Sequence, residues 1–134
     1  MIELMQVTIY PRGPGNYHHS DFRNPIWELV DAHLSTMDAF EKPILSLLQD
    51  ASNPGTDMMM VCGGDDIFHI QTADSRGFWS QAFDPRGSEE IVAVWTSDQG
   101  FDTEKKYTWS LDTTRSIVHY YLEHAKPHPV YNWE

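Results

Sequence analysis

Residues 110–134 read SLDTTRSIVHYYLEHAKPHPVYNWE. In the first part of this stretch, apolar side chains recur at helical spacing and predict one amphipathic helix: Val118, Tyr121, Leu122 and Ala125. Pro127 and Pro129 then end the helix, because proline has no backbone N–H to continue it. The aromatic residues that follow predict a short last strand over 130–133.

Working back along the chain, short apolar runs alternate with turns from residue 57 onward. The runs predict five strands, over residues 58–62, 67–71, 77–83, 91–96 and 105–109. Residues rich in Gly, Pro, Asp and Asn separate several of them and predict turns at 63–66, 84–87 and 98–100. Strands joined by short turns are typical of an antiparallel meander.

The amino-terminal third is more varied. Residues 2–10 predict an opening strand, and the polar residues 16–21 predict a loop. Asn24-Pro25 is typical of a helix start, and apolar residues continue at helical spacing to Met37. Residues 39–48 fit a second helix or a turn and a strand, since Pro43 obstructs a long helix.

Taken together, the elements predict a single α+β domain over residues 1–134. In it, an antiparallel β-sheet meander packs against an N-terminal and a C-terminal helix. The hydrophobic share of 40% and the aromatic share of 13% are too high for a disordered chain.

The charge of the chain is strongly negative. Its 20 Asp and Glu residues against 9 Lys and Arg residues leave a formal net charge of −11. Such a charge repels nucleic acid and anionic membranes and attracts basic partners. With no signal peptide and no apolar run of membrane-spanning length, we expect a cytoplasmic protein. The one cysteine, Cys62, sits in an apolar run and is expected to be a buried thiol.

Several histidines raise the question of a metal site or an acid–base pair. No two of them fall at the spacing that places two imidazoles on one helix face without an intervening proline, so we expect no metal and no cofactor. Gly63-Gly64-Asp65-Asp66 reads as a hairpin turn rather than as a catalytic motif. If the chain were nevertheless a small hydrolase, His69 and His119 would be its acid–base residues.

Acidic side chains concentrate in the predicted turns. Because the turns of a meander gather at the two ends of its sheet, several of these carboxylates are expected to form one anionic surface for a basic partner. The candidate contact residues are Asp65, Asp66, Asp84, Glu89, Glu90, Asp98, Asp102 and Glu104.

Four tryptophans fall in or beside predicted strands: Trp79, Trp95, Trp109 and Trp133. At least two of them are expected to fill the core. A tryptophan at a sheet edge can instead anchor an interface. The sequence leaves open which tryptophan does which.

The carboxyl terminus resembles the Imm1 family of bacterial immunity proteins. The resemblance lies in residues 109–112 (WSLD), the helix around Tyr121-Leu122, and residues 126–134 (KPHPVYNWE). Members typically end with a helix, a tight turn, a Pro-x-x-Val-like element and a terminal Trp. The residues that stand closest to this ending are Pro129, Val130 and Trp133. Ala125-Lys126 replaces the usual Gly after the helix.

This resemblance implies a non-enzymatic inhibitor that binds a cognate toxin domain in a 1:1 complex. The toxins of such systems of bacterial competition often act on nucleic acid, as nucleases or deaminases. The acidic surface would then occlude a basic substrate cleft. The alternatives are the small carboxylate- and histidine-dependent hydrolase and a cytosolic adaptor that binds another protein.

Overall fold

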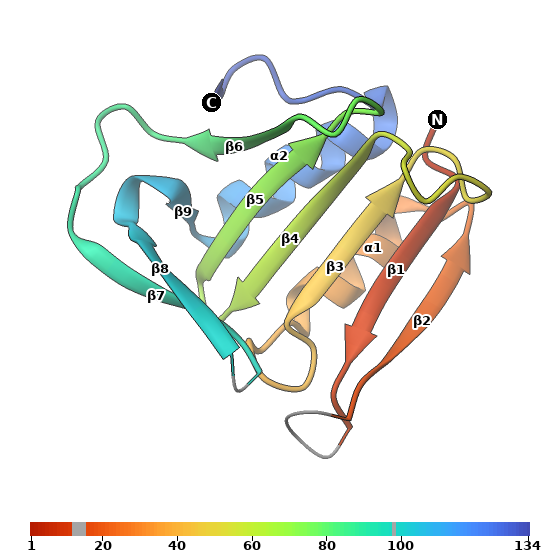
Figure 1. Cartoon of the computed structure of the whole chain (residues 1–134), viewed down its shortest axis with the longest axis horizontal. Helices are drawn as coiled ribbons and strands as arrows, with labels where there is room; N and C mark the ends of the chain where they lie inside the picture. Colours follow the sequence, from red (N-terminus) through yellow and green to blue (C-terminus); the bar gives the residue numbers. More distant parts are fainter. Residues whose placement is uncertain (12–15, 98) are drawn as a thin grey trace.

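The computed structural model describes residues 1–11, 16–97 and 99–134 and shows one α+β domain (Figure 1). Within these residues, eight strands form the main antiparallel sheet in the order β10-β6-β5-β4-β3-β1-β2, and β9 pairs with β5 on the same edge as β6. The strands of this sheet are β1 (Leu4–Ile9), β2 (His18–Arg23), β3 (Ile44–Leu48), β4 (Met58–Gly64), β5 (Ile67–Ala73), β6 (Trp79–Phe83), β9 (Thr108–Trp109) and β10 (Asn132–Trp133).

Two helices, α1 (Trp27–Ser35) and α2 (Leu111–His124), cover one face of this sheet and lie behind it in Figure 1. A separate hairpin of β7 (Ile91–Thr96) and β8 (Gln99–Glu104) crosses in front of one end of the sheet. A 3-10 turn, η1 (Lys105–Tyr107), leads from the hairpin back to β9.

The predicted α+β class and the antiparallel sheet are confirmed, but the helices lie inside the chain rather than at its ends. Strands β1 and β2 precede α1, and β10 follows α2. The prediction of a loop over residues 16–21 was wrong, because His18–Arg23 forms β2. An edge strand pairs on one side only and exposes most of its side chains, so it needs few apolar residues; Phe22 alone packs against the core.

The predicted meander is interrupted after β6, because β7 and β8 pair with each other and not with the main sheet. The turn predicted at 98–100 was wrong in extent, since Gln99 and Gly100 already pair with Thr96 and Trp95. The strand predicted over 105–109 is a strand only at Thr108–Trp109. It is short because β6 occupies the rest of the same edge of β5.

Near the amino terminus, the first helix starts later than predicted. Its N-cap is Ile26, whereas Asn24 adopts a left-handed conformation with φ 48° and donates its N–H to Glu3 O. The open question at residues 39–48 is resolved as a turn followed by β3, which begins directly after Pro43.

The predicted carboxyl-terminal helix is confirmed as α2. Ser110 caps its first turn, where the Ser110 side chain accepts a hydrogen bond from the Thr113 N–H. Ala125 ends the helix in a left-handed conformation with φ 55°, and its N–H donates to Tyr121 O. The chain then turns back through the prolines to β10.

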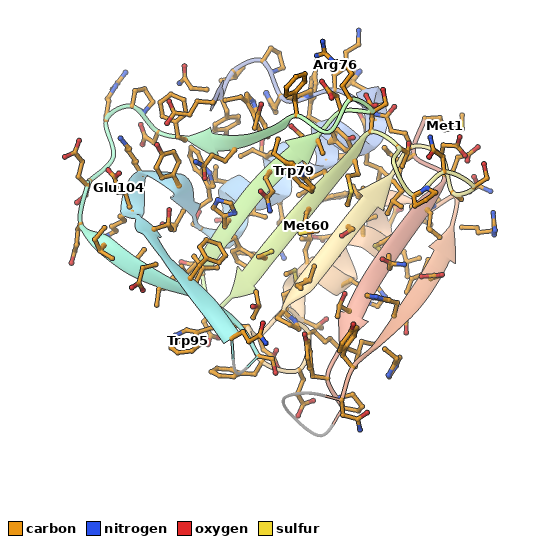
Figure 2. All side chains as sticks on the ribbon, in the orientation of Figure 1. Met1, Met60, Arg76, Trp79, Trp95 and Glu104 are labelled. Carbon is orange, nitrogen blue, oxygen red and sulfur yellow. The ribbon has the colours of Figure 1, made fainter. Side chains whose placement is uncertain are left out.

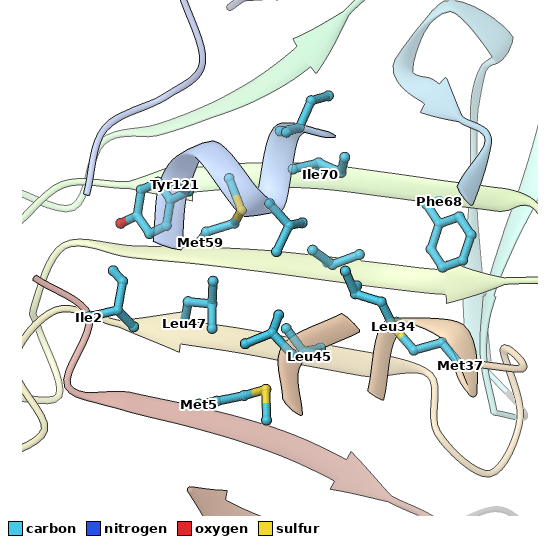
Figure 3. Packing of buried hydrophobic residues seen from close by; sticks show 14 of the residues in the cluster. Ile2, Met5, Leu34, Met37, Leu45, Leu47, Met59, Phe68, Ile70 and Tyr121 are labelled. Carbon is cyan, nitrogen blue, oxygen red and sulfur yellow. The ribbon is translucent and has the colours of Figure 1, made fainter. Parts of the chain in front are cut away.

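The hydrophobic core lies between the helices and one face of the sheet (Figure 3). Alternation along β3 points Leu45 and Leu47 into it, and Met59 and Ile70 add to the same layer from the next strands. The helices contribute Leu34 from α1 and three fully or almost fully buried residues from α2: Ile117, Val118 and Tyr121. Burial of this face is the main force that holds the helices on the sheet.

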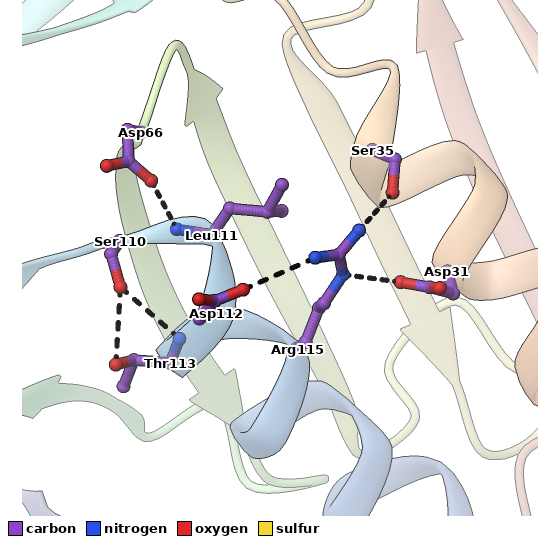
Figure 4. A network of polar contacts seen from close by, with 8 residues as sticks. All are labelled: Asp31, Ser35, Asp66, Ser110, Leu111, Asp112, Thr113 and Arg115. Carbon is purple, nitrogen blue, oxygen red and sulfur yellow. Dashed lines mark hydrogen bonds and ion pairs between the residues drawn. The ribbon is translucent and has the colours of Figure 1, made fainter.

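Arg115 of α2 also ties the two helices together through polar contacts (Figure 4). Its Nε donates to Asp31 Oδ1 and its Nη2 donates to Ser35 Oγ, both at 2.7 Å. A third contact of 3.3 Å joins Nη1 to Asp112 Oδ1, one turn earlier in α2. In the part of the chain that the structure describes, no helix has the length and apolar character needed to cross a membrane.

Candidate functional site

The face of the main sheet opposite the helices is largely uncovered, and Figure 2 looks directly onto it. Alternation along the central strands directs polar and flexible side chains there, among them Ser46, Met60 and Gln71. Trp79 of β6 lies on this face with 49% of its surface exposed. Exposed tryptophan on a sheet face is a feature of interaction surfaces rather than of cores.

The β7–β8 hairpin covers one end of this face and is firmly attached there. Val94 is fully buried, and its strand β7 contacts β4 and β5 of the main sheet. At the hairpin tip, the Ser97 N–H donates to Ala39 O at 2.8 Å. Phe101 packs edge-on against His69, with ring centroids 5.1 Å apart. The inner side of the hairpin is therefore part of the fold, and its outer side is available to a partner.

A hollow of about 500 Å³ lies between the hairpin tip and the β1–β2 hairpin. Gln99 borders it on one side, and Tyr10 and Tyr17 border it on the other, with their rings 5.5 Å apart. On its floor, Thr8 Oγ1 and His19 Nδ1 are 3.1 Å apart. The lining contains no carboxylate among the described residues, so this hollow is not the site of the predicted acidic contacts.

The predicted acidic contact residues lie at the end of the molecule that carries the hairpin. Asp65 and Asp66 form the β4–β5 turn, Asp84 follows β6, and Glu89-Glu90 precede β7. Asp102 and Glu104 belong to β8, opposite Ala93 and Ile91 of β7. Figure 1 places the β4–β5 turn, the connection from β6 to β7, and β8 toward the same side of the molecule, the side on which Figure 2 labels Glu104. The eighth candidate, Asp98, lies outside the described residues.

Basic side chains interrupt this acidic surface. Lys106 Nζ lies 3.4 Å from Glu104 Oε2, and a cavity of about 590 Å³ is lined by Asp66 and Asp84 together with Lys105 and Lys106. Desolvation lowers the pKa of Lys106, but the carboxylates around it, first Glu104, raise that pKa above its usual value. On this surface the carboxylates therefore outnumber the two lysines, Lys105 and Lys106.

Some of the candidate carboxylates are already committed to the fold. Asp66 Oδ1 accepts a hydrogen bond from the Leu111 N–H at 2.7 Å, and Asp84 Oδ1 accepts one from the Arg86 N–H at 2.9 Å. By contrast, four exposed carboxylates make no hydrogen bond or ion pair with the residues that the structure describes: Asp65, Glu89, Glu90 and Asp102. These four are the ones available to a partner.

The two histidines of the hydrolase hypothesis lie on opposite sides of the sheet. His69 is on the helix-free face, 5% exposed beneath Phe101, and its Nε2 donates to Gln81 Oε1 at 2.7 Å. Burial lowers the pKa of His69. His119 is on α2, stacked on Trp27 with centroids 4.2 Å apart and paired with Glu123. The two imidazoles cannot act on one substrate atom.

The remaining reactive groups to consider are the cysteine and any cluster of metal-binding side chains. Cys62 is buried, and desolvation raises the pKa of its thiol to about 12, which keeps it protonated. Among the described residues, no three His, Cys, Asp or Glu side chains come together in a group able to hold a metal ion.

The sequence did not show which tryptophans are buried and which are exposed, and the structure does. Trp109 and Trp133 pack against the core, whereas Trp79 and Trp95 are about half exposed. Phe101, which no sequence pattern singled out, is also exposed. The alternation of side chains along residues 91–96 could have predicted the exposure of Trp95, because it places Trp95 on the side of the strand opposite Val94.

No protein-family model and no curated protein matches the sequence. The fold is similar to the crystal structure of a hypothetical protein from Neisseria gonorrhoeae, with a TM-score of 0.64. The match covers 95% of this chain and 91% of that chain at 12% sequence identity. At this identity the similarity concerns the fold alone.

Proposed function

We propose that this chain is an immunity protein that binds and neutralises a cognate bacterial toxin domain. The observation that carries the proposal is the gathering of seven candidate carboxylates at one end of the domain, around the β7–β8 hairpin. The Imm1-like residues at the carboxyl terminus support the same function. Membership of the Imm1 family is part of what we propose.

The proposed mechanism is occlusion. A toxin that acts on nucleic acid, such as a nuclease or a deaminase, needs a basic cleft to hold phosphates. The carboxylates of Glu89, Glu90 and Asp102 take the place of phosphates in that cleft and exclude the substrate. Opposite charge also accelerates encounter, so association should slow as salt concentration rises.

The hydrolase alternative has little support, because His69 and His119 face opposite sides of the sheet. An adaptor that binds a cellular protein would use the same exposed surface as an immunity protein. The identity of the partner distinguishes the two functions. An immunity gene normally lies directly after its toxin gene, so the partner of an immunity protein is encoded directly upstream.

The test is co-expression with the protein encoded directly upstream. We expect that protein to arrest growth when expressed alone, and we expect this chain to restore growth and copurify with it in a 1:1 complex. A harmless neighbour, or a toxic neighbour that forms no complex, would overturn immunity.

Charge reversals then test the acidic surface. The double variant Glu89→Lys/Glu90→Lys should weaken the complex and flatten its salt dependence, because it removes long-range attraction. The matched control is Asp21→Lys/Glu28→Lys, which places the same charge change on exposed residues of β2 and α1. Equal affinity for the two double variants would reject the acidic surface while leaving immunity intact.

A further inference from the structure

The outer side of the β7–β8 hairpin carries a small hollow of about 150 Å³. Its lining residues are Ala93, Trp95, Gly100, Phe101 and Asp102. Resting on the proposed function, we propose that this hollow binds an arginine side chain of the partner protein. In this arrangement the guanidinium lies on the indole of Trp95 and pairs with the carboxylate of Asp102.

The pairing of the two strands creates the hollow. Trp95 lies opposite Gly100, and Ala93 lies opposite Asp102, so a large aromatic ring and a carboxylate flank two small residues on one face. A Cβ at position 100 would lie 3.2 Å from Trp95 Cε3 and 2.6 Å from Val94 O. Glycine at this position therefore keeps the space beside the indole open.

The attachment of the hairpin holds Trp95 outward. Because Val94 is fully buried and Phe101 packs on His69, the alternation of side chains directs Trp95 away from the main sheet. Figure 2 shows Trp95 on that outer side. A preformed, anchored ring loses little conformational freedom on binding, which favours its use as an interface anchor.

The chemistry of the hollow matches arginine better than other side chains. Trp95 is 48% exposed, so the surface of its indole ring is available to a cation. Asp102 has no ion-pair partner among the described residues. A guanidinium stacks on an aromatic face and donates two parallel hydrogen bonds to one carboxylate, whereas the ammonium of lysine is a compact point charge.

Charge decides between possible occupants. The net charge of −11 disfavours a nucleotide or a nucleic acid strand, whose phosphates would meet the carboxylates at this end of the molecule. It also disfavours a second copy of the same chain. A basic protein surface has the complementary charge, and arginine is the basic residue most enriched at interface cores.

The first experiment does not need the toxin. The ¹⁵N-labelled chain is titrated with N-acetyl-arginine amide and, in parallel, with N-acetyl-citrulline amide, the uncharged analogue of the same shape. We expect arginine to shift the Trp95 indole N–H and the amides of residues 100–102, and citrulline to shift them much less. Equal shifts with both compounds, or arginine shifts confined to other residues, would overturn the inference.

Two variants test whether Trp95 and Asp102 are the residues that bind arginine. Trp95→Leu and Asp102→Asn should each remove the arginine-specific shifts, while the remaining amide spectrum shows that the hairpin is folded. The matched controls are Trp79→Leu, an equally exposed tryptophan on β6, and Asp21→Asn, an exposed carboxylate on the edge strand β2. Arginine binding that survives Asp102→Asn would reject the ion pair and with it the proposed site.

The complex with the toxin separates this inference from the proposed function. In a confirmed complex, Trp95→Leu should weaken binding by roughly tenfold or more, as expected for an anchor residue. A tight complex that is unaffected by Trp95→Leu would reject the anchor and leave immunity standing. Absence of any complex would reject immunity, while the arginine titration would still decide whether the hollow has the proposed preference.

Discussion

Asp66 in the β4–β5 turn accepts a hydrogen bond from the backbone N–H of Leu111, the first residue of α2, at 2.7 Å (Figure 4). The four leading N–H groups of a helix have no partner within the helix, so a carboxylate here satisfies one of them and interacts favourably with the helix dipole. One acidic residue that the sequence assigned to partner binding thus stabilises the junction between sheet and helix.

We therefore expect Asp66→Ala to destabilise the protein more than Asp65→Ala. Both residues have positive φ, at 64° and 51°, so alanine introduces similar backbone strain at each position. Of these two aspartates, only Asp66 accepts a hydrogen bond from the start of α2, and loss of such a capping bond costs about 1 kcal/mol. Urea denaturation of the two variants measures the difference. Equal midpoints would show that the contact with Leu111 contributes nothing.

Gly63, near the end of β4, provides a test of the close backbone packing in the β4–β5 hairpin. A Cβ at this position would lie 2.2 Å from Ile67 O, at a φ of +109°. Gly77 also has a positive φ, +86°, but open space around it. We expect Gly77→Ala to cost about 1 kcal/mol from strain alone and Gly63→Ala to cost clearly more. Thermal unfolding compares them, and similar melting temperatures would contradict the predicted clash.

Arg115 should matter more than other surface arginines, because it joins Asp31 and Ser35 of α1 to α2. We expect Arg115→Leu to lower the urea midpoint. Arg76→Leu is the matched control, since Arg76 forms its ion pair with Asp74, two residues away in the same turn. If both variants unfold at the same urea concentration, the interhelical bridge is not stabilising.

The buried His69 predicts a loss of stability in mild acid. Burial lowers the pKa of His69 in the folded protein below its usual value of 6.5, so the unfolded chain binds protons more readily. Stability should therefore fall as pH drops below about 6.5. Burial and the nearby Lys42 lower the pKa of His33 with the same sign.

The measurement is urea unfolding at pH 7.5 and pH 5.5 for the wild type and His69→Gln. The variant should lose less stability between the two values, even if it is less stable at both. NMR titration of the His69 imidazole should give a midpoint below 6.5. A midpoint above 6.5, or an unchanged loss in the variant, would contradict this prediction.

Cys62 should be inert in the folded protein. Burial raises its pKa to about 12, and the thiolate is the reactive form of cysteine. We expect a disulfide reagent such as DTNB to react slowly at pH 8 and rapidly once urea unfolds the chain. Fast reaction without denaturant would show that the thiol is reachable from solvent.

Local patterns in the sequence were sufficient for several elements. The spacing of apolar residues before Pro127 predicted α2, and the runs on either side of Gly63-Gly64-Asp65-Asp66 predicted β4 and β5. These signals are reliable because helix and strand periodicity reflects which face is buried. The polar strand β2 escaped prediction, because an exposed edge strand carries almost no such signal.

Only the tertiary structure decided how distant residues meet. Neither the edge-on contact of Phe101 with His69 nor the hydrogen bond from Leu111 to Asp66 follows from local spacing, since each joins residues more than 30 positions apart. The same applies to the separation of His69 from His119 by the sheet. By itself, the sequence determined an acidic α+β chain with its main helix and hairpins. The folding of β7–β8 off the sheet decided that Asp102 and Trp95 are exposed on its outer side, because that arrangement depends on packing between strands far apart in the chain.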